Sequence, residues 1–248
     1  MNDDAGSRPA RLDGCTVVLP AHNEQGNVSR AVSSVRVAAT EWATEVEVVV
    51  VDDGSSDGTA AEAAAAGARV VRHSVNRGYG AALRSGFNEA RQPWIWLVDA
   101  DNQFEARELA RLVAHAGAAD LVIGYRASRA EGWRRAAATG AWRTLAQAAL
   151  GPLARDVDCA FKLMRTDVVR AFDLRCDGAA LSAELLARAR RKGLVIVEVP
   201  VTHLPRTVGV PTGLRPRVVV DALAELWRLR AELAVSGGRP LRSVSPPR

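Results

Sequence analysis

Short apolar runs alternate with longer helical patterns along most of this 248-residue chain. The run at 46–51 is almost unbroken in valine, a composition typical of a parallel strand that is covered on both faces. Repeated alternation of this kind predicts an α/β domain with a mainly parallel, Rossmann-like sheet flanked by helices. The strands that we expect are 15–19, 46–51, 69–72, 94–98, 120–124 and 194–199, and the expected helices are 26–43, 57–67, 80–91, 105–116, 134–150 and 180–192.

The composition limits the partners and the compartment. A net charge of +5 and a pI of about 9.7 favour anionic partners such as nucleotides or phospholipid surfaces. The three cysteines form no CxxC pair, which argues against a disulfide framework or a structural zinc site and favours a reducing cytoplasm. No signal peptide and no apolar stretch of about 18 to 20 residues is apparent. Nucleic-acid binding is disfavoured, because no recognised motif appears and aromatic residues are only 5%.

Three of the expected strands end in polar residues. The segment 20–24 follows the first strand, 52–59 follows the second, and 99–103 follows the strand at 94–98. Ligands of open α/β sheets bind at the carboxyl ends of the strands. We therefore expect these three segments to converge at one edge of the sheet and to form a single site.

Asp99 and Asp101 are the strongest candidates for chemistry. They flank one small residue directly after a buried strand, and Gln103 supplies a neutral oxygen two residues later. Mg²⁺ and Mn²⁺ prefer such oxygen ligands and usually bind together with substrate phosphates. The alternative is a helix N-terminus, where acidic residues favour the helix dipole. That alternative explains Asp101 alone better than it explains both carboxylates.

The other two polar segments allow a structural and a functional interpretation together. In 52–59, Asp57 is suited to cap the next helix, while Asp52 and Asp53 can face a nucleotide base or ribose. The segment 76–80, which contains Arg77, precedes a helix and favours anion binding. The first strand lacks a Gly-x-Gly-x-x-Gly turn, which argues against a dinucleotide-dependent oxidoreductase.

These motifs occur in the order seen in glycosyltransferase family 2, and the resemblance spans about residues 14–205. It implies the GT-A fold, a nucleoside-diphosphate sugar donor, an activating Mg or Mn ion held by Asp99, Asp101 and Gln103, and inversion at the anomeric carbon. The donor contacts that it implies are Pro20, Ala21, Asn23, Glu24, Asp52, Asp53, Arg77, Asp99 and Ala100.

The second half of the chain most resembles the polyprenol-phosphate (dolichol-phosphate) sugar transferases of that family. The resemblance rests on 158–163 and 199–206, although Ala160 stands where glycine is usual. It implies that the acceptor phosphate is held by cationic side chains, and the alternative is an arginine-rich solvated surface. The residues concerned are Arg126, Arg143, Lys162 and Arg206.

Composition and the resemblance together predict how the chain is divided. Residues 1–11 and 236–248 are rich in Gly, Ser, Pro and Arg, so we expect a disordered N-terminus and a disordered tail. The resemblance implies a GT-A domain at 12–205, and an acceptor loop with an amphipathic helix at 206–235. Many members carry C-terminal transmembrane helices, and this chain shows none. The basic amphipathic helix suits either peripheral contact with the inner face of a membrane or packing against its own domain or a second subunit. The oligomeric state is left open.

Three functions remain after this reading. The first is metal-dependent, inverting transfer of a hexose from a GDP-mannose or UDP-glucose type of donor to a polyprenyl phosphate. In it Asp99 and Asp101 hold the ion, and Gln103 orients the ion or the acceptor phosphate. The second is a soluble transferase that glycosylates a sugar or natural-product hydroxyl, with Asp158 as base. The third is a nucleotide-sugar-binding module without catalysis.

Overall fold

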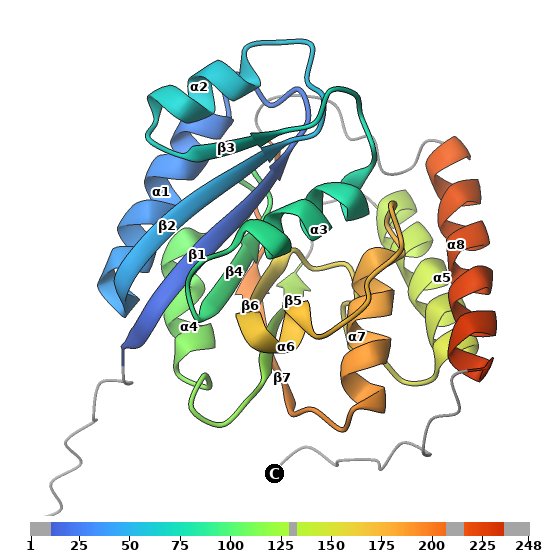
Figure 1. The fold of residues 1–248 in the computed structure, drawn as a ribbon. Coiled ribbons are helices and arrows are strands. Elements are labelled where there is room, and N and C mark those ends of the chain that lie inside the picture. The colour runs from blue at the N-terminus through green and yellow to red at the C-terminus, as the bar shows by residue number, and fades with distance from the viewer. Residues whose placement is uncertain (1–10, 129–132, 207–215, 236–248) are drawn as a thin grey trace, which may run out of the picture.

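The computed structural model describes residues 11–128, 133–206 and 216–235, which fold around a seven-stranded sheet in the order β3-β2-β1-β4-β6-β5-β7 (Figure 1). β3, β2, β1 and β4 run parallel to one another. β6 is antiparallel to both β4 and β5, and β7 is parallel to β5. The predicted α/β class is therefore confirmed. The strands are β1 (Leu12–Ala21), β2 (Ala43–Asp52), β3 (Arg69–Arg72), β4 (Trp94–Val98), β5 (Leu121–Ser128), β6 (Phe161–Arg165) and β7 (Ile196–Thr202).

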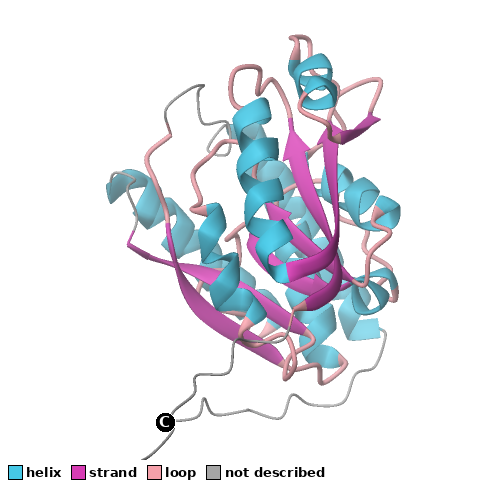
Figure 2. Ribbon diagram, turned by 90° about the vertical axis from the view of Figure 1, so that its left-hand side faces the viewer, coloured by secondary structure: helices cyan, strands magenta, loops and turns pink. Residues whose placement is uncertain are grey.

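Helices cover both faces of the sheet, as the two views in Figures 1 and 2 show. One core joins β1 and β2 to helices α1 and α4, and the other joins β4 and β5 to helices α3, α5, α6, α7 and α8. Alternate β1 residues point to opposite cores, with Val17 in the first and Val18 in the second. The helices are α1 (Val28–Trp42), α2 (Thr59–Ala65), α3 (Tyr79–Glu89), the short 3₁₀ helix η1 (Ala106–Glu108), α4 (Leu109–Val113), α5 (Trp133–Leu150), α6 (Thr166–Arg170), α7 (Leu181–Arg191) and α8 (Pro216–Val235).

The sequence patterns did not indicate β6 or α6. β6 reads Phe-Lys-Leu-Met-Arg, and its Lys162 is completely buried. A buried lysine breaks the apolar run by which an interior strand is recognised, so the pattern of 161–165 suggested no strand. In the structure, β6 inserts between β4 and β5, and Lys162 pairs with Leu97. This position brings the 156–160 segment next to the end of β4.

The ends of the chain fall mainly outside the described residues. The predicted disordered segments at 1–10 and 236–248 and most of the predicted acceptor loop, at 207–215, are not described. Arg11 is described, and its guanidinium donates to the carbonyl oxygens of Thr40 and Ala43. Within the described ranges, no helix has the length and apolarity needed to cross a bilayer.

Candidate active site

The site lies where β1, β2 and β4 end. β1 pairs in parallel with β2 on one side and with β4 on the other, and Ala21 is opposite Asp52. Parallel pairing places the carboxyl ends of these strands along one edge. Residues 20–24, 52–59 and 99–103 therefore converge as expected, and Asp53 N donates to Ala21 O at 2.8 Å.

The turn after β4 holds Asp99 and Asp101. Asp101 Oδ1 accepts a hydrogen bond from Gln103 N at 3.1 Å, while Asn102 adopts a positive φ of 58° and donates to Asn27 O. Asparagine tolerates this left-handed conformation better than most residues. Asp99 Oδ1 accepts from the Tyr79 hydroxyl at 3.0 Å. The turn therefore presents two carboxylates whose positions are set by separate partners.

A cationic side chain lies against this pair. Arg206, just after β7, places Nη2 2.7 Å from Asp101 Oδ2 and Nη1 3.1 Å from Glu24 Oε1. Its Nε is buried and has no hydrogen-bond partner among the residues that the structure describes. Arg206 therefore joins the ends of β1, β4 and β7 and compensates the Asp101 charge. The sequence assigned Arg206 to an acceptor phosphate, and the structure places it within reach of the metal candidates.

The surroundings of Asp99 change its ionisation. Burial, and then repulsion from Asp101, raises the pKa of Asp99 from 3.8 to about 7, against the opposing effects of Tyr79, Lys162 and Arg126. At neutral pH, a bound proton or another cation lowers the free energy of this buried, closely spaced pair of carboxylates. Two closely spaced carboxylates supply the hard oxygen ligands that Mg²⁺ and Mn²⁺ prefer. The donor set therefore fits a divalent cation.

The pKa of Asp99 predicts a pH-dependent stability of the protein in EDTA. This carboxyl ionises near 3.8 when unfolded and near 7 when folded, so the folded state holds its proton over the interval between. Its contribution is complete below the unfolded pKa and is lost as pH rises through the folded pKa. We expect the melting temperature to fall between about pH 4 and pH 7, the interval between the two pKa values, and Asp99→Asn to flatten that fall. Equal pH slopes in the two proteins would contradict this assignment.

Coordination by the protein alone is incomplete. Among the residues that the structure describes, no group of three or more His, Cys, Asp or Glu side chains is arranged to hold a metal ion. Gln103, the third predicted ligand, donates through Nε2 to Leu204 O at 3.0 Å. Mg²⁺ is commonly bound by one or two carboxylates, with substrate phosphates and water completing the shell. Asp99 and Asp101 suit that arrangement.

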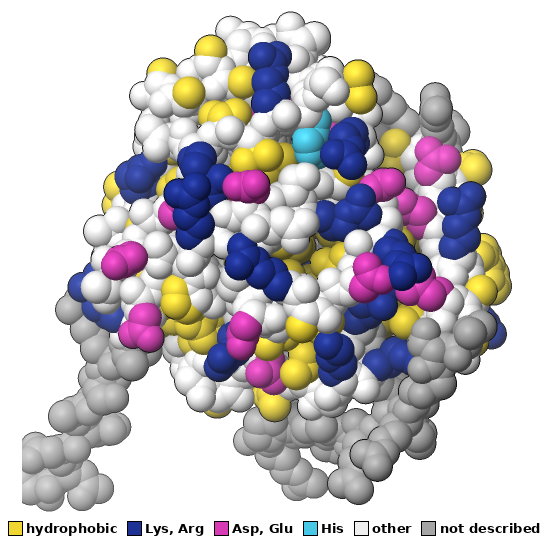
Figure 3. All heavy atoms as spheres, in the orientation of Figure 1, with side chains coloured by type: hydrophobic (Ala, Val, Ile, Leu, Met, Phe, Trp, Pro, Cys, Tyr) yellow, Lys and Arg dark blue, Asp and Glu magenta, His cyan; other side chains and the backbone are white. Residues whose placement is uncertain are grey.

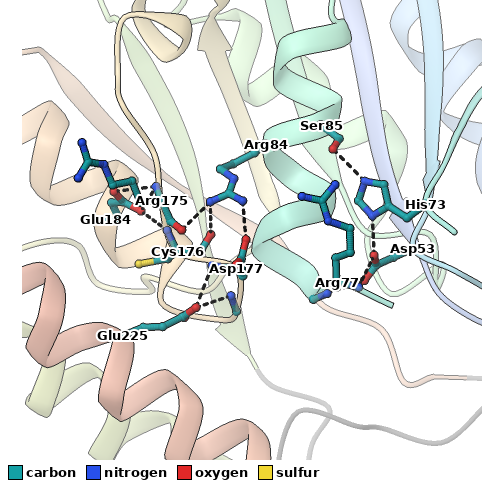
Figure 4. Close-up of polar contacts among 12 residues, drawn as sticks. Asp53, His73, Arg77, Arg84, Ser85, Arg175, Cys176, Asp177, Glu184 and Glu225 are labelled. Carbon is teal, nitrogen blue, oxygen red and sulfur yellow. Dashed lines mark hydrogen bonds and ion pairs between the residues drawn. The ribbon is translucent and has the colours of Figure 1, made fainter. Parts of the chain in front are cut away.

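Asp53 organises the loop that follows β3 (Figure 4). Its two carboxylate oxygens accept hydrogen bonds from Arg77 N and Gly78 N, both at 2.9 Å, and Oδ1 lies 2.6 Å from His73 Nδ1. His73 Nε2 in turn lies 2.9 Å from Ser85 Oγ. The sequence assigned Asp53 to the donor, whereas in the structure its carboxylate fixes this loop. Arg77 contributes only its backbone N–H to that contact, and its side chain is exposed.

Asp52 is equally tied to its own turn. It is completely buried, its Oδ1 accepts from Ser55 N at 2.9 Å, and its Oδ2 lies 3.1 Å from Arg72 Nε. Asn23, in a left-handed conformation with φ of 55°, accepts from Ser56 N through Oδ1. These contacts lock the ends of β1 and β2 together. Asp57, the predicted cap, accepts from Thr59 N at the start of α2.

A second cluster lies beside Asp99. Lys162 Nζ donates to the carbonyl oxygens of Val157 and Cys159, and burial lowers the pKa of its ammonium. Asp158 accepts from Trp142 Nε1 at 3.1 Å, and burial raises the pKa of its carboxyl. Lys162 acts electrostatically on both Asp99 and Asp158. The structure therefore brings this predicted cation and the candidate base together.

The remaining predicted phosphate-binding residues differ in setting. Arg126 forms a bidentate pair with Asp156, at 2.6 Å through Nε and 2.7 Å through Nη2, and this pair is almost completely buried. Arg143 is exposed and donates to Arg155 O. The charge of Arg126 also lowers the pKa of Asp99, whereas Arg143 has no described contact with Asp99 or Asp101.

Two side chains at the site were missed. Tyr79 lies in a segment that the sequence singled out for its glycines, but its contact with Asp99 spans 20 positions. Trp142 reaches Asp158 from α5. Neither contact is a consequence of local spacing, and no sequence signal marked either residue.

Comparison with known proteins agrees with this geometry. Residues 16–172 match the model of glycosyl transferase family 2. The polyprenol monophosphomannose synthase of Mycolicibacterium smegmatis is 33% identical, over 93% of this chain and 92% of its own. The undecaprenyl-phosphate 4-deoxy-4-formamido-L-arabinose transferase of Edwardsiella ictaluri is 34% identical over 78% of this chain. This chain spans only about three fifths, 61%, of that transferase.

Solved structures with the same fold include glucosyl-3-phosphoglycerate synthase of Mycobacterium tuberculosis in complex with phosphoglyceric acid. It superposes with a TM-score of 0.71 at 22% identity, covering 89% of this chain and 80% of that one. The same synthase in complex with Mn²⁺, uridine-diphosphate-glucose and phosphoglyceric acid gives a TM-score of 0.65 at 22% identity, covering 86% of this chain and 80% of that one. At this level of identity, the likeness supports the GT-A fold.

Proposed function

Because the chain belongs to glycosyl transferase family 2, we propose that it transfers a hexose from a nucleoside-diphosphate sugar to a polyprenyl phosphate, with a divalent metal at Asp99 and Asp101. The observation that carries this proposal is the placement of Lys162, Arg126 and Arg206 around the two carboxylates. Two relatives of stated function are named for polyprenol or undecaprenyl phosphate.

The acceptor half of the proposal rests on charge. A phosphate monoester is largely dianionic at neutral pH, because its second pKa is near 6. Such an acceptor needs cations to position it, and Arg206 has two hydrogen bonds to carboxylates that a phosphate can replace. When bound, the metal neutralises charge on the departing nucleoside diphosphate. Arg206 then passes from a partner of Asp101 to a partner of the acceptor.

The reaction needs no proton transfer with this acceptor. A phosphate oxygen forms the bond to the anomeric carbon, the bond from that carbon to the donor diphosphate breaks, and its electron pair leaves with the nucleoside diphosphate. Attack opposite the leaving group inverts the anomeric carbon. Arg206 would hold the nucleophile, and the buried Lys162 and the largely buried Arg126 add positive charge beside it. Asp99 and Asp101, in their ionised forms, would hold the metal.

Asp158 supports the second candidate function, transfer to a hydroxyl. Burial raises the pKa of this carboxyl beside the site, which favours proton acceptance near neutral pH. Two contacts weigh against that role. Trp142 Nε1 donates to Asp158 Oδ1, and Lys162 stabilises its charged form. These contacts lower the basicity of the carboxylate and fit a residue that helps to hold Lys162.

One experiment separates the two acceptors. Enzyme, Mn²⁺ and a panel of labelled GDP- and UDP-sugars are mixed with a polyprenyl phosphate or with soluble sugar alcohols, and the organic-extractable label is counted. We expect label in the lipid fraction, and we expect Asp158→Asn to retain transfer within about tenfold. Transfer only to alcohols, abolished in Asp158→Asn, would replace the lipid phosphate with a hydroxyl acceptor.

α8 supports a contact with the membrane that holds such an acceptor. One face packs into the core, and an adjacent face is apolar yet exposed, with Val220 63% and Trp227 59% accessible. Arg228 and Arg230 are exposed on either side of that face, and the Arg230 guanidinium lies 5.5 Å from the Trp227 ring centre. The packed residues are Ala222, Leu226, Leu229 and Leu233, and the outward residues are Val220, Leu223, Ala224, Trp227, Ala231 and Ala234.

This arrangement suits an anionic bilayer. Tryptophan at the headgroup level and arginines beside an apolar stripe are features of helices that lie in a membrane interface. Figure 3 shows hydrophobic side chains at the right-hand edge, where α8 runs, and Lys and Arg side chains spread over the neighbouring surface. We therefore assign the outward face of α8 to peripheral membrane binding, which keeps the site near its lipid.

A further inference from the structure

The loop before α7 is held by carboxylates from two helices (Figure 4). Asp177 N and Gly178 N donate to Glu225 Oε1 of α8, at 2.8 Å and 2.9 Å. The two amides before them donate to the completely buried Glu184 of α7. A Cβ on Gly178 would lie 2.9 Å from Glu225 Oε2, so a larger residue here would displace the Glu225 carboxylate. Four consecutive backbone N–H groups therefore fix the path of residues 175–178.

The same loop contacts the beginning of α3. Ala81 N donates to Asp177 O at 3.1 Å. A Cβ on Gly78 would lie 2.5 Å from Asp177 O, and a Cβ on Gly80 would lie 2.6 Å from Cys176 O. Both glycines are therefore required by close backbone contact. Gly78 additionally has a φ of 103°, which other residues rarely adopt.

Tyr79 stands between these two glycines. Its backbone is held on both sides by the loop, and its hydroxyl donates to Asp99 Oδ1 at 3.0 Å. Arg84, one turn further along α3, adds an ion pair to Asp177 and a hydrogen bond to Cys176 O. A displacement of the loop must therefore displace the start of α3, and with it the hydroxyl that orients Asp99.

We propose that Glu225 is a positioning residue for Asp99. The Glu225 carboxylate holds the 176–178 loop, and this loop holds the Gly78–Gly80 backbone. Tyr79, between these glycines, donates to the Asp99 carboxylate. The helix that we assign to the membrane thereby also sets the geometry of the metal ligand. This inference rests on the proposed function, because it takes Asp99 as a ligand of the divalent cation.

The test measures Mn²⁺ affinity by electron paramagnetic resonance, with saturating UDP and, in parallel, with saturating GDP. Partners of metal ligands typically change metal affinity by 10- to 100-fold, so we expect Tyr79→Phe to weaken Mn²⁺ binding about tenfold. Glu225→Ala should weaken it by about threefold to tenfold. Glu225→Gln retains an acceptor oxygen and should restore most of the affinity.

The double variant Tyr79→Phe/Glu225→Ala decides whether the two residues act through one path. If they do, the double variant should have the same Mn²⁺ affinity as whichever single variant binds Mn²⁺ less tightly, so the two losses of affinity do not add. Additive losses would overturn the path through Tyr79. Nucleoside diphosphate affinity in EDTA should be the same in all variants, since the coupling concerns the metal ligand only.

Glu232→Gln is the matched control. Glu232 lies on the same helix and pairs with the side chains of Arg188, at 2.8 Å, and Arg175, at 3.8 Å, whereas Glu225 accepts from the backbone of Asp177 and Gly178. We expect its Mn²⁺ affinity to equal that of the wild type, which excludes a general loosening of α8 as the cause. Wild-type affinity in Glu225→Ala would overturn this inference alone. A wild-type protein that binds no Mn²⁺ with either nucleotide would overturn the proposed function as well.

Discussion

Asp101→Asn is expected to lower sugar transfer by about 10²- to 10³-fold, the cost of removing one electrostatic contact to developing charge. Asparagine keeps the size of the side chain and an oxygen that can accept from Gln103 N. It removes the charge that Arg206 now compensates and that would hold the metal. The measurement is transfer to the lipid acceptor, together with the rise in melting temperature on adding Mn²⁺ and donor, which should also be lost.

The variant should fold, since Asp101 lies in a turn after β4 and asparagine matches its size. Asp167→Asn is a matched control, because Asp167 is an exposed carboxylate paired with Arg165 away from the site. Transfer within tenfold of the wild type in Asp101→Asn would remove this carboxylate from the chemistry. A retained Mn²⁺ response would do the same.

Val220→Glu/Trp227→Glu is expected to release the protein from anionic vesicles. Burying each of these side chains contributes about 1.5–3 kcal/mol when complete, so partial insertion of both predicts a loss of about 10²-fold in partitioning. The measurement is co-sedimentation with phosphatidylglycerol vesicles. Binding by the wild type should weaken as salt rises, because the arginines beside the stripe attract the anionic surface.

Val37→Glu provides the matched control for this experiment. Val37 is 66% exposed on α1, which packs in the opposite core from α8. It should bind vesicles like the wild type. The result would differ if a second copy of the chain covered the outward face of α8. In that case the wild type would not bind vesicles but would form a dimer in sedimentation velocity, and the double variant at Val220 and Trp227 would abolish that dimer.

Transfer to the lipid in detergent offers a further comparison. The double variant at Val220 and Trp227 should retain it, because these side chains face away from the core. Asp101→Asn should lose it under either condition. The two substitutions therefore separate delivery of the enzyme to the membrane from the chemistry at the sheet edge.

Much of the fold was predictable because its signals are local. The parallel strands β1, β2 and β4 are continuous apolar runs, and each ends in polar residues that turned out to share one edge. β6 was missed because Lys162, a completely buried cation, interrupts its apolar pattern. That lysine is tolerated because the carbonyl oxygens of Val157 and Cys159 accept from it and nearby acidic side chains, including Asp99 of a distant segment, favour its charge.

The site was predictable to the same degree. The spacing of Asp99 and Asp101 indicated a shared cation, and their mutual repulsion in the folded protein agrees with it. The partner and the exposure of each arginine were not predictable. Arg126, Arg143 and Arg206 look alike in the sequence, yet one is buried against Asp156, one is exposed, and one lies on Asp101.

The sequence by itself determined the α/β class, the polar strand ends and the carboxylate pair, because each depends on neighbouring residues and on the period of a strand or helix. Only the tertiary structure decided what surrounds that pair. Tyr79, Lys162 and Arg206 reach Asp99 and Asp101 from three separate segments. Contacts between distant segments depend on strand order and helix packing, which no local pattern specifies.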